Sequence, residues 1–315
     1  MLYISGETLN VCFLGTAGSL PTPNRNPSCV MIRRGSETIL FDCGEGSQQQ
    51  MMRASGNTNF RVKAIFITHW HADHFLGILG LLQTLSFYGR TEDLIIYGPL
   101  GIHEYVEYIR ILSGKLRFLI RGREMSDGRT ENFSGYSVTA FKTHHRIIGI
   151  GYTLIEEKRP GKFDREAAIA LGVPIGPLFS CLQAGEPVNV KHEDEEITIF
   201  PQQVMGEMRT GRKIVYTGDT RPMYNSAPES LTGADLLIHD ATYIDKDKVR
   251  AEEFFHSTAS EAGKVGRFLK AKRLALVHIS SRYTQTADHV REAESEYEGE
   301  ILAPYDLDYL EIPYS

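Results

Sequence analysis

The sequence predicts an α/β fold in which two β-sheets pack face to face and helices cover their outer faces, an αββα sandwich of four layers. Three observations support this prediction. Apolar segments of strand length recur along all 315 residues, helical patterns interrupt them throughout, and several neighbouring strands are joined by connections too short for a parallel crossover. The length fits two domains or one domain with an insertion, and we predict a single domain over residues 1–315.

Strand segments are recognised by alternating or continuous apolar residues that end at a turn. Residues 34–37, Arg-Gly-Ser-Glu, separate two such segments and predict a hairpin turn. The expected strands are 10–14, 30–33, 38–42, 62–68, 94–97, 136–142, 152–155, 197–200, 213–216, 236–238, 274–277 and 309–312.

Helical patterns are fewer than strand patterns and are spread over the whole length. They are expected at 46–54, 75–87, 102–112, 165–171, 258–269 and 287–296. The most apolar stretch, 75–88, is interrupted by Gly77 and Gly80 and is shorter than the roughly 20 residues that cross a bilayer. We therefore expect no membrane span.

The composition is that of a folded globular protein. Hydrophobic residues make up 42% and charged residues 23%, which excludes intrinsic disorder, and 34 basic against 40 acidic residues give a net charge of −6. Residues 1–15 show no export signal, so we expect a cytoplasmic protein. The four cysteines have no CxxC spacing and are expected to be buried thiols rather than disulfides or metal ligands: Cys12, Cys29, Cys43 and Cys181.

Residues 156–189 depart from this regular pattern. They are rich in proline and glycine and contain one short helical pattern, which favours a functional insertion or a disordered segment. The beginning of this segment is basic, with Lys158, Arg159, Lys162 and Arg165. The acidic run at 192–196 that follows is expected to be a solvated turn.

Four potential metal ligands lie within six residues after the apolar strand at 62–68. The sequence there is His69-Trp70-His71-Ala72-Asp73-His74. Imidazole and carboxylate are ligands for zinc, and the mixture with oxygen also suits manganese or iron. Without a metal, so many adjacent polar groups would compete for partners, so the cluster predicts a metal site.

Three further ligands are expected from distant parts of the chain, because each follows an apolar strand and would reach the same sheet edge. They are His145, Asp219 and His278, and His144 competes with His145. We expect one ion on His69, His71 and His145, a second on Asp73, His74 and His278, and Asp219 between them. Two ions about 3.5 to 4 Å apart can activate water and clamp a phosphodiester, which predicts a hydrolase.

These motifs resemble the metallo-β-lactamase superfamily: HxHxDH at 69–74, His145, GDT at 218–220 and HISSRY at 278–283. Within it, the segments at 13–29 and 40–51, the spacing from His145 to Tyr152 and HSTA at 256–259 resemble the ribonuclease Z family of tRNA 3′-processing endonucleases. The resemblance covers residues 10 to 285.

The resemblance implies precursor tRNA as substrate, removal of the 3′ trailer with a 3′-hydroxyl left on the tRNA and a 5′-phosphate on the trailer, two zinc ions per chain and a homodimer. Asp73 would bind metal and accept a proton from water, and His256 would protonate the leaving 3′-oxygen. Residues 156–189 would form a protruding arm that grips the tRNA away from the active site, with phosphate contacts from Lys158, Arg159, Lys162 and Arg165. Alternatively, the arm is a surface loop over an apolar patch or a dimer contact.

One position departs from the family pattern. Where the family has HEAT, this chain has His239-Asp240-Ala241-Thr242, with a shorter carboxylate. His239 and Asp240 therefore either support His256 or form a hydrogen-bonded pair at a strand end. Asp42 belongs to another family-like motif, and either shapes the floor of the site or caps the helix that begins near Gly46.

Other interpretations stay open. Trp70 either stacks on a nucleobase or packs against the wall of the site, and we favour packing. The protein could instead be a hydrolase of a small phosphodiester or other ester, which needs no basic arm. It could also be a binding protein that has lost its metals, although all seven expected ligands are present.

Overall fold

The computed structural model describes residues 7–55, 61–192, 195–224 and 226–314. The chain divides into two compact units. The core unit consists of Thr8–Ile155 and Arg212–Ser315, and the second unit, here called the arm, contains Glu156–Gly211. Each unit is described by itself.

The first of two seven-stranded sheets in the core unit combines antiparallel and parallel pairing. β1, β3 and β4 form an antiparallel meander, whereas β4, β5, β6 and β7 run parallel. The strand order is β18 (Tyr309–Glu311), β1 (Leu9–Gly15), β3 (Cys29–Arg34), β4 (Glu37–Phe41), β5 (Val62–Phe66), β6 (Leu94–Gly98) and β7 (Ile120–Glu124).

The second sheet has the same number of strands and a parallel half. β13, β14, β15 and β17 are parallel, and β10 joins β13 in antiparallel register. The order is β17 (Glu300–Leu302), β15 (Arg273–Val277), β14 (Leu236–Asp240), β13 (Lys213–Tyr216), β10 (Ile150–Glu156), β9 (Tyr136–Lys142) and β8 (Thr130–Phe133). A short parallel pair, β2 (Ala17–Gly18) and β16 (Ile279–Ser280), lies apart from these sheets.

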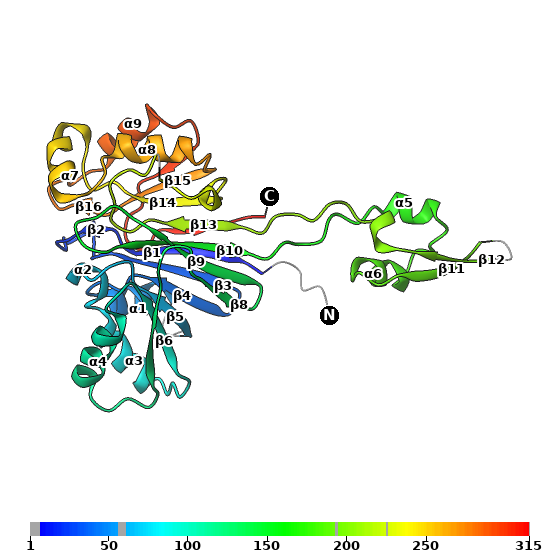
Figure 1. The fold of residues 1–315 in the computed structure, drawn as a ribbon, viewed down its shortest axis with the longest axis horizontal. Helices are drawn as coiled ribbons and strands as arrows, with labels where there is room; N and C mark the ends of the chain where they lie inside the picture. Colours follow the sequence, from blue (N-terminus) through cyan, green and yellow to red (C-terminus); the bar gives the residue numbers. More distant parts are fainter. Residues whose placement is uncertain (1–6, 56–60, 193–194, 225, 315) are drawn as a thin grey trace. The chain divides into compact units, whose positions relative to one another are not determined.

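The two sheets pack face to face through aromatic rings. Phe41 of the first sheet stacks on Tyr152 and Tyr216 of the second, each at 5.6 Å between ring centroids. Helices cover the outer faces, as Figure 1 shows. α1 (Ser47–Ser55), α3 (Ile78–Phe87) and α4 (Ile102–Ser113) cover the first sheet, and α8 (Ala259–Phe268) and α9 (Ala287–Glu294) cover the second. The predicted αββα sandwich is confirmed.

The predicted helix at 75–87 is wrong at its start. The structure has a short α2 (Ala72–Phe75), a break, and then α3. Gly77 lies at the break, where a Cβ would fall 2.0 Å from the carbonyl oxygen of Gly44. This backbone approach requires glycine and turns the chain away from a continuous helix. The hairpin at 34–37 is confirmed, with Gly35 at a φ of 53°.

Several elements were not predicted, because their residues are polar or they lack a clear period. β7, for example, reads Ile-Arg-Gly-Arg-Glu and has only one fully buried apolar residue, Ile120. The unpredicted elements of the core unit are β2, β7, β8, β16, β17, α7 (Lys248–Phe254) and the 3-10 turns Glu229–Leu231 and Asp245–Asp247.

The arm has its own small core, formed by Ala168, Val173, Leu182, Val188, Val190, Ile199 and Val204. It contains α5 (Arg165–Ala170), α6 (Pro177–Gln183), the turn Pro201–Gln203 and a hairpin of β11 (Val188–His192) and β12 (Glu195–Ile199). The unit runs to Gly211, beyond the expected end at residue 189, because β12 pairs with β11 and the following residues form bridges from Met205 to Phe163 and from Arg209 to Arg159. The turn expected at 192–196 is shorter than that: β11 includes His192, and β12 begins at Glu195. Residues 193–194 lie outside the described residues.

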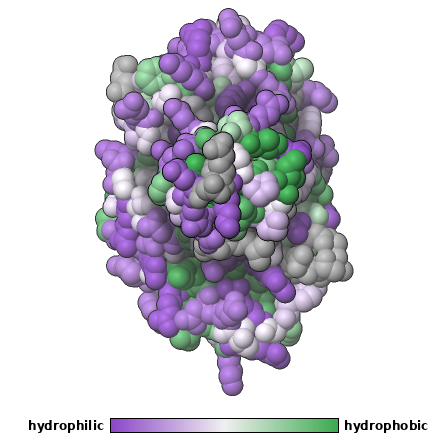
Figure 2. Space-filling model, turned by 90° about the vertical axis from the view of Figure 1, so that its right-hand side faces the viewer, coloured by the Kyte–Doolittle hydropathy of each residue, from purple (hydrophilic) through white to green (hydrophobic). Residues whose placement is uncertain are grey.

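The surface and the thiols agree with the composition. The face in Figure 2 is mostly hydrophilic, with hydrophobic residues in small groups between polar ones. All four cysteines are free thiols; Cys12, Cys29 and Cys43 are buried, and Cys181 is half-buried. Among the described residues, no helix has the length and apolar character needed to cross a membrane.

Candidate metal centre

The predicted ligands gather at one edge of the core unit, where strands end. Residues 69–74 follow β5, His145 follows β9, Asp219 follows β13, and His278 follows β15. Because the buried strands are held in register by the two sheets, their carboxyl ends fix the positions of these loops. Strands far apart in sequence therefore deliver side chains to one place.

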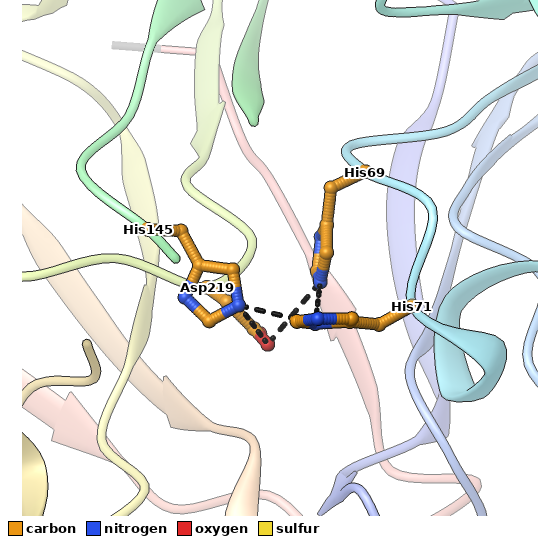
Figure 3. Close-up of side chains that lie close together, drawn as sticks. All are labelled: His69, His71, His145 and Asp219. Atoms are coloured by element: carbon orange, nitrogen blue, oxygen red, sulfur yellow. Dashed lines mark hydrogen bonds and ion pairs between the residues drawn. The ribbon is translucent and has the colours of Figure 1, made fainter. Parts of the chain in front are cut away.

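The first cluster consists of His69, His71, His145 and Asp219, whose side chains point toward one another (Figure 3). Nδ1 of His71 lies 2.9 Å from Nε2 of His69 and 3.1 Å from Nε2 of His145. Oδ2 of Asp219 lies 3.5 Å from Nε2 of His69 and 3.9 Å from Nε2 of His145.

The second cluster consists of Asp73, His74 and His278. Oδ2 of Asp73 lies 3.4 Å from Nε2 of His74 and 3.4 Å from Nε2 of His278. Asp219 also reaches this cluster, with Oδ2 at 3.4 Å from Nε2 of His74 and Oδ1 at 3.3 Å from Nε2 of His278. The seven residues therefore lie together in the arrangement expected from the sequence, with Asp219 contacting both groups.

The geometry fits divalent metal ions. Ligand atoms placed about 2.0 to 2.2 Å from a tetrahedral ion lie about 3.3 to 3.6 Å from each other, which the second cluster matches and the imidazole pairs of the first approach. Nε2 of His74 and Oδ1 of Asp219 are buried and have no hydrogen-bond partner among the described residues. Buried polar atoms rarely lack a hydrogen-bond partner, and a bound cation would provide a partner for both atoms.

Four imidazoles are oriented by a hydrogen-bond acceptor that contacts Nδ1, the ring nitrogen that faces away from the clusters. Nδ1 of His74 lies 2.7 Å from Oδ2 of Asp42, and Nδ1 of His145 lies 2.9 Å from the carbonyl oxygen of Phe255. The hydroxyls of Thr68 and Thr242 lie 3.0 Å and 2.8 Å from Nδ1 of His69 and His278. These contacts fix the rings with Nε2 directed at the clusters. His71 differs, because it presents Nδ1.

Asp42 lies beneath His74 and is fully buried. Its carboxylate accepts the backbone N–H of Thr68 at 2.8 Å and the hydroxyl of Tyr216 at 2.7 Å, besides contacting His74. These partners belong to the floor of the site and not to the start of α1, so the helix-capping alternative is wrong. The backbone of Asp42 has a φ of 57°, a left-handed conformation that is costly outside glycine and that concentrates at functional sites.

Electrostatics in the clusters favours ionised carboxylates and mostly neutral imidazoles. Burial alone would raise the pKa of Asp219, but the imidazoles of His278, His74 and His69 hold it well below its usual range. Burial lowers the pKa of His69, and the neighbouring His74 lowers it further. Burial likewise lowers the pKa of His145. Neutral imidazole and carboxylate are the protonation states that bind metals.

His256 lies beside the clusters and is paired with Asp240. Nδ1 of His256 lies 2.9 Å from Oδ2 of Asp240, and its ring stacks on His278 at 5.0 Å between centroids. Burial opposes a charge on His256, but the carboxylate of Asp240 raises its pKa to about 9. Asp240 also accepts the N–H of Thr220 and both the N–H and hydroxyl of Thr242. Asp219, Asp240, His256 and His278 also lie within ligand distance of one another, but both oxygens of Asp240 already accept hydrogen bonds.

The structure also decides between alternatives left open by the sequence. Nε2 of His144 lies 3.0 Å from the hydroxyl of Ser226, whereas His145 is in the first cluster. Trp70 stacks on Tyr105 at 4.0 Å and donates to the carbonyl of Leu100, so it packs against the wall. Nδ1 of His239 lies 2.7 Å from the backbone oxygen of Asp240, away from His256.

Some residues of the site were missed by the sequence analysis. Thr68 and Thr242 adjoin recognised motifs, and a hydroxyl next to a ligand was the available signal. Phe255 contributes only its carbonyl oxygen, which leaves no trace in the side-chain pattern. The basic candidates Lys158, Arg159, Lys162 and Arg165 all belong to the arm; Arg159 is half-buried and the other three are exposed.

Known proteins resemble this chain in sequence and in fold. Residues 22–166 match the metallo-beta-lactamase superfamily, and residues 181–279 match the beta-lactamase superfamily domain. The chain is 49% identical to ribonuclease Z from Methanosarcina acetivorans, over 97% of this chain and 99% of that protein. It is 46% identical to ribonuclease Z from Methanosarcina mazei, over 97% and 99%. The structure resembles the short form of human tRNase Z with a TM-score of 0.69 and 27% identity, over 96% and 99%.

Proposed function

The chain belongs to the ribonuclease Z family of the metallo-β-lactamase superfamily, and we propose that it is the metal-dependent endoribonuclease that removes the 3′ trailer from precursor tRNA. Cleavage leaves a 3′-hydroxyl on the tRNA and a 5′-phosphate on the trailer. The observation that carries this proposal is the juxtaposition of two ligand clusters with the hydrogen-bonded pair of His256 and Asp240. Hydrolysis of a phosphodiester needs an activated water on one side of the phosphorus and a proton for the leaving oxygen on the other. The clusters would serve the first need and His256 the second.

The metal complement is two zinc ions per chain, held by the two clusters with Asp219 between them. The supporting observation is that these seven residues form two of the three groups of donors that lie within ligand distance among the described residues. The third group, Asp219, Asp240, His256 and His278, is the one in which Asp240 is hydrogen-bonded to His256. Manganese and iron also accept this mixture of donors. When bound, such ions polarise a phosphodiester and lower the pKa of water toward neutrality.

Asp73 accepts a proton from the attacking water. Its carboxylate lies at the edge of the second cluster, and its Oδ2 accepts the backbone N–H of Ser19 at 3.0 Å, which fixes its direction. Burial raises the pKa of Asp73, but His74 and His278 bring it well below its usual range, so the carboxylate is ionised. Only the ionised carboxylate can accept a proton, and the contact with Ser19 fixes the direction of its oxygen.

His256 protonates the leaving 3′-oxygen of the tRNA. Because Nδ1–H donates to Asp240, the second proton of the imidazolium is on Nε2. General acid catalysis of this kind contributes about 10²- to 10⁴-fold to a rate. Asp240 thus supports His256 in the role expected of the longer glutamate in the family motif.

The arm supplies binding energy for the tRNA. Lys158, Arg159, Lys162 and Arg165 contact phosphates, and an open groove of about 460 Å³ lies beside Lys162 and Arg165. Since the whole chain has a charge of −6, phosphate binding requires such a local concentration of positive charge. We regard residues 1–315 as one catalytic domain with this inserted tRNA-binding unit.

The assembly is a homodimer in the cytoplasm. Dimerisation is supported by the family resemblance and by exposed apolar side chains on α3 and α4, among them Phe87, Tyr108, Ile111 and Leu112. Four free thiols suit a reducing compartment. Sedimentation velocity at micromolar concentration would show a species of twice the chain mass, and a purely monomeric profile would exclude the dimer.

The test of the function is incubation with a tRNA precursor carrying a 3′ extension, with both product ends mapped. We expect one cut after the discriminator nucleotide and near-complete loss of cleavage in Asp73→Ala. Bis(p-nitrophenyl) phosphate serves as a small diester in parallel. Hydrolysis of the small diester without cleavage of the precursor would identify a small-substrate hydrolase instead, and less than about one metal equivalent per chain would favour a binding protein.

A further inference from the structure

We propose that Arg221 is a positioning residue for the reaction, which holds His256 at the leaving 3′-oxygen through a buried ion pair with Glu261. The inference rests on the acid role proposed for His256. Arg221 follows the GDT motif directly, and its guanidinium is directed at His256 and Glu261. Its role is to fix the backbone of the acid, whereas Asp240 fixes the ring.

The guanidinium of Arg221 has two sets of contacts. Nη1 donates to the backbone carbonyl oxygen of His256. Nη1 and Nη2 also donate to the two carboxylate oxygens of Glu261, at 2.9 Å and 2.7 Å. The side chains are 20% and 7% exposed, so the pair is largely removed from water. A planar bidentate pair of this kind has a defined geometry that a lysine cannot reproduce.

Glu261 connects this pair to the loop that carries His256. Its Oε2 accepts the N–H of Thr258 at 3.0 Å, and its own N–H donates to the hydroxyl of Thr258 at 3.2 Å. These are the reciprocal contacts of a capping box at the start of α8. The loop from His256 to Thr258 is therefore fastened at both ends to one carboxylate and one guanidinium.

The backbone of Arg221 links the same loop to the ligand clusters. Its N–H donates to the carbonyl of His144 at 2.8 Å, next to the ligand His145. The hydroxyl of Ser257 donates to the carbonyl of Thr220 at 2.6 Å, next to the ligand Asp219. The segment of Thr220 and Arg221 thus sets the distance between His256 and the ligand clusters.

Such spacing matters more for proton transfer than for metal binding. A displacement of about 1 Å in a reacting group can lower a rate about 10²-fold. Loss of Arg221 would leave Asp240 bonded to the ring of His256 but would release the carbonyl of His256 and remove the bidentate partner of Glu261, whose Oε1 would keep only Lys248 at 4.0 Å. We therefore expect a defect confined to protonation of the leaving group.

The test compares leaving groups in Arg221→Met, with the full-length protein loaded with zinc. One substrate is a 3′-extended tRNA precursor, and the other is the same RNA with sulfur in place of the scissile 3′-oxygen. Because a thiolate leaves without protonation, it does not need the acid. We expect kcat to fall about 10²-fold on the oxygen substrate, with KM unchanged, and less than about 5-fold on the sulfur substrate.

Matched variants separate the outcomes. Arg291→Met removes an exposed ion pair with Asp288 and should change neither rate. Glu261→Gln keeps the side-chain volume and removes the charge that pairs with Arg221, so it should repeat the pattern of Arg221→Met. It tests the inference independently in case Arg221→Met folds poorly. Metal content by elemental analysis should stay at the wild-type value.

Three results would overturn the inference. Equal losses on both substrates, or a loss of metal, would make Arg221 a structural residue, and unchanged rates would leave it without a role. His256→Ala distinguishes failure of the positioning role of Arg221 from failure of the proposed function. If His256→Ala shows the leaving-group dependence and Arg221→Met does not, positioning by Arg221 is excluded; if His256→Ala lacks it, the acid assignment itself is wrong.

Discussion

Nδ1 of His256 lies 2.9 Å from Oδ2 of Asp240, although aspartate is one methylene shorter than the glutamate of the family motif. The shorter side chain reaches because Asp240 ends β14 and is itself tied to Thr220 and Thr242. Through the hydroxyl of Thr242 the same carboxylate orients His278. One buried anion therefore serves the proposed acid and a proposed metal ligand.

Asp240→Asn tests this shared role. The amide keeps the shape but removes the anion, so His256 loses the partner that favours its charged form. We expect kcat on precursor tRNA to fall about 10²-fold or more, with zinc still bound. Steady-state kinetics and elemental analysis would measure both, and Asp288→Asn on the exposed face of α9 is the control. A variant with wild-type kcat would refute the role of Asp240.

Asp42→Asn should weaken metal binding without disturbing the backbone, because asparagine also tolerates a positive φ. The amide is a poorer acceptor for Nδ1–H of His74, for Tyr216 and for Thr68. Loss of such a supporting carboxylate typically lowers metal affinity about 10- to 100-fold. Competition with a chelator would measure the affinity, and an unchanged value would show that Asp42 is only a packing residue.

Gly44→Ala should displace the loop that carries Asp73. An added Cβ would lie 2.4 Å from the carbonyl oxygen of Asp73 and 2.7 Å from Cβ of Pro27. Neither the backbone of Asp73 nor the ring of Pro27 can move enough to make room for the new Cβ. We therefore expect a loss of about 1 to 3 kcal/mol in unfolding free energy and a reduced metal content. Gly206→Ala is the control, since its nearest atom lies at 3.5 Å. Equal metal content in the two variants would contradict the expectation.

The sequence predicted the ligand clusters because local rules suffice for them. A polar residue after a buried strand lies at the sheet edge, and this rule placed His145, Asp219 and His278 beside residues 69–74. The αββα layering followed from the same strand pattern. These features depend on near neighbours in the chain and on the common direction of parallel strands.

Features that depend on distant contacts were missed. The break at Gly77 is caused by Gly44, and the partners of Asp42 lie up to 174 residues away. In the sequence Arg221 looks like any surface arginine, and only its contacts with His256 and Glu261 reveal its position beside the site. The arm was ended too early because β11 and β12 contain polar residues that hide their pairing from the hydrophobic pattern.

Neutralising the arm should weaken tRNA binding but not chemistry. In the triple variant Lys158→Ala, Lys162→Ala, Arg165→Ala we expect a higher KM for precursor tRNA and unchanged hydrolysis of bis(p-nitrophenyl) phosphate. The slope of log K against log salt should become shallower by about 0.7 to 0.9 for each phosphate that the variant no longer neutralises. Filter binding over a salt series measures this, with Arg291→Ala as the control. A slope equal to the wild type would show that these residues do not contact RNA.

His289 predicts an acid-sensitive core. It is fully buried in α9, its two ring nitrogens have no hydrogen-bond partner among the described residues, and its ring meets Tyr283 edge-on. Burial, helped by the charge of Arg25 and opposed by Asp288, lowers its pKa to about 4. Since the pKa of His289 is lower in the folded state than in the unfolded state, stability is complete above about pH 6.5 and is lost as the pH falls toward 4, by at most about 3 kcal/mol.

His289→Phe removes the titrating group and keeps a ring of similar shape. Urea denaturation at pH 7 and pH 5 should show a smaller loss of unfolding free energy in this variant than in the wild type, by about 2 kcal/mol. The metal ligands also bind protons in this range, but they are common to both proteins and cancel in the difference. His103→Phe on the exposed side of α4 should keep the wild-type loss. If His289→Phe and wild type lose the same free energy, the buried imidazole does not limit acid stability.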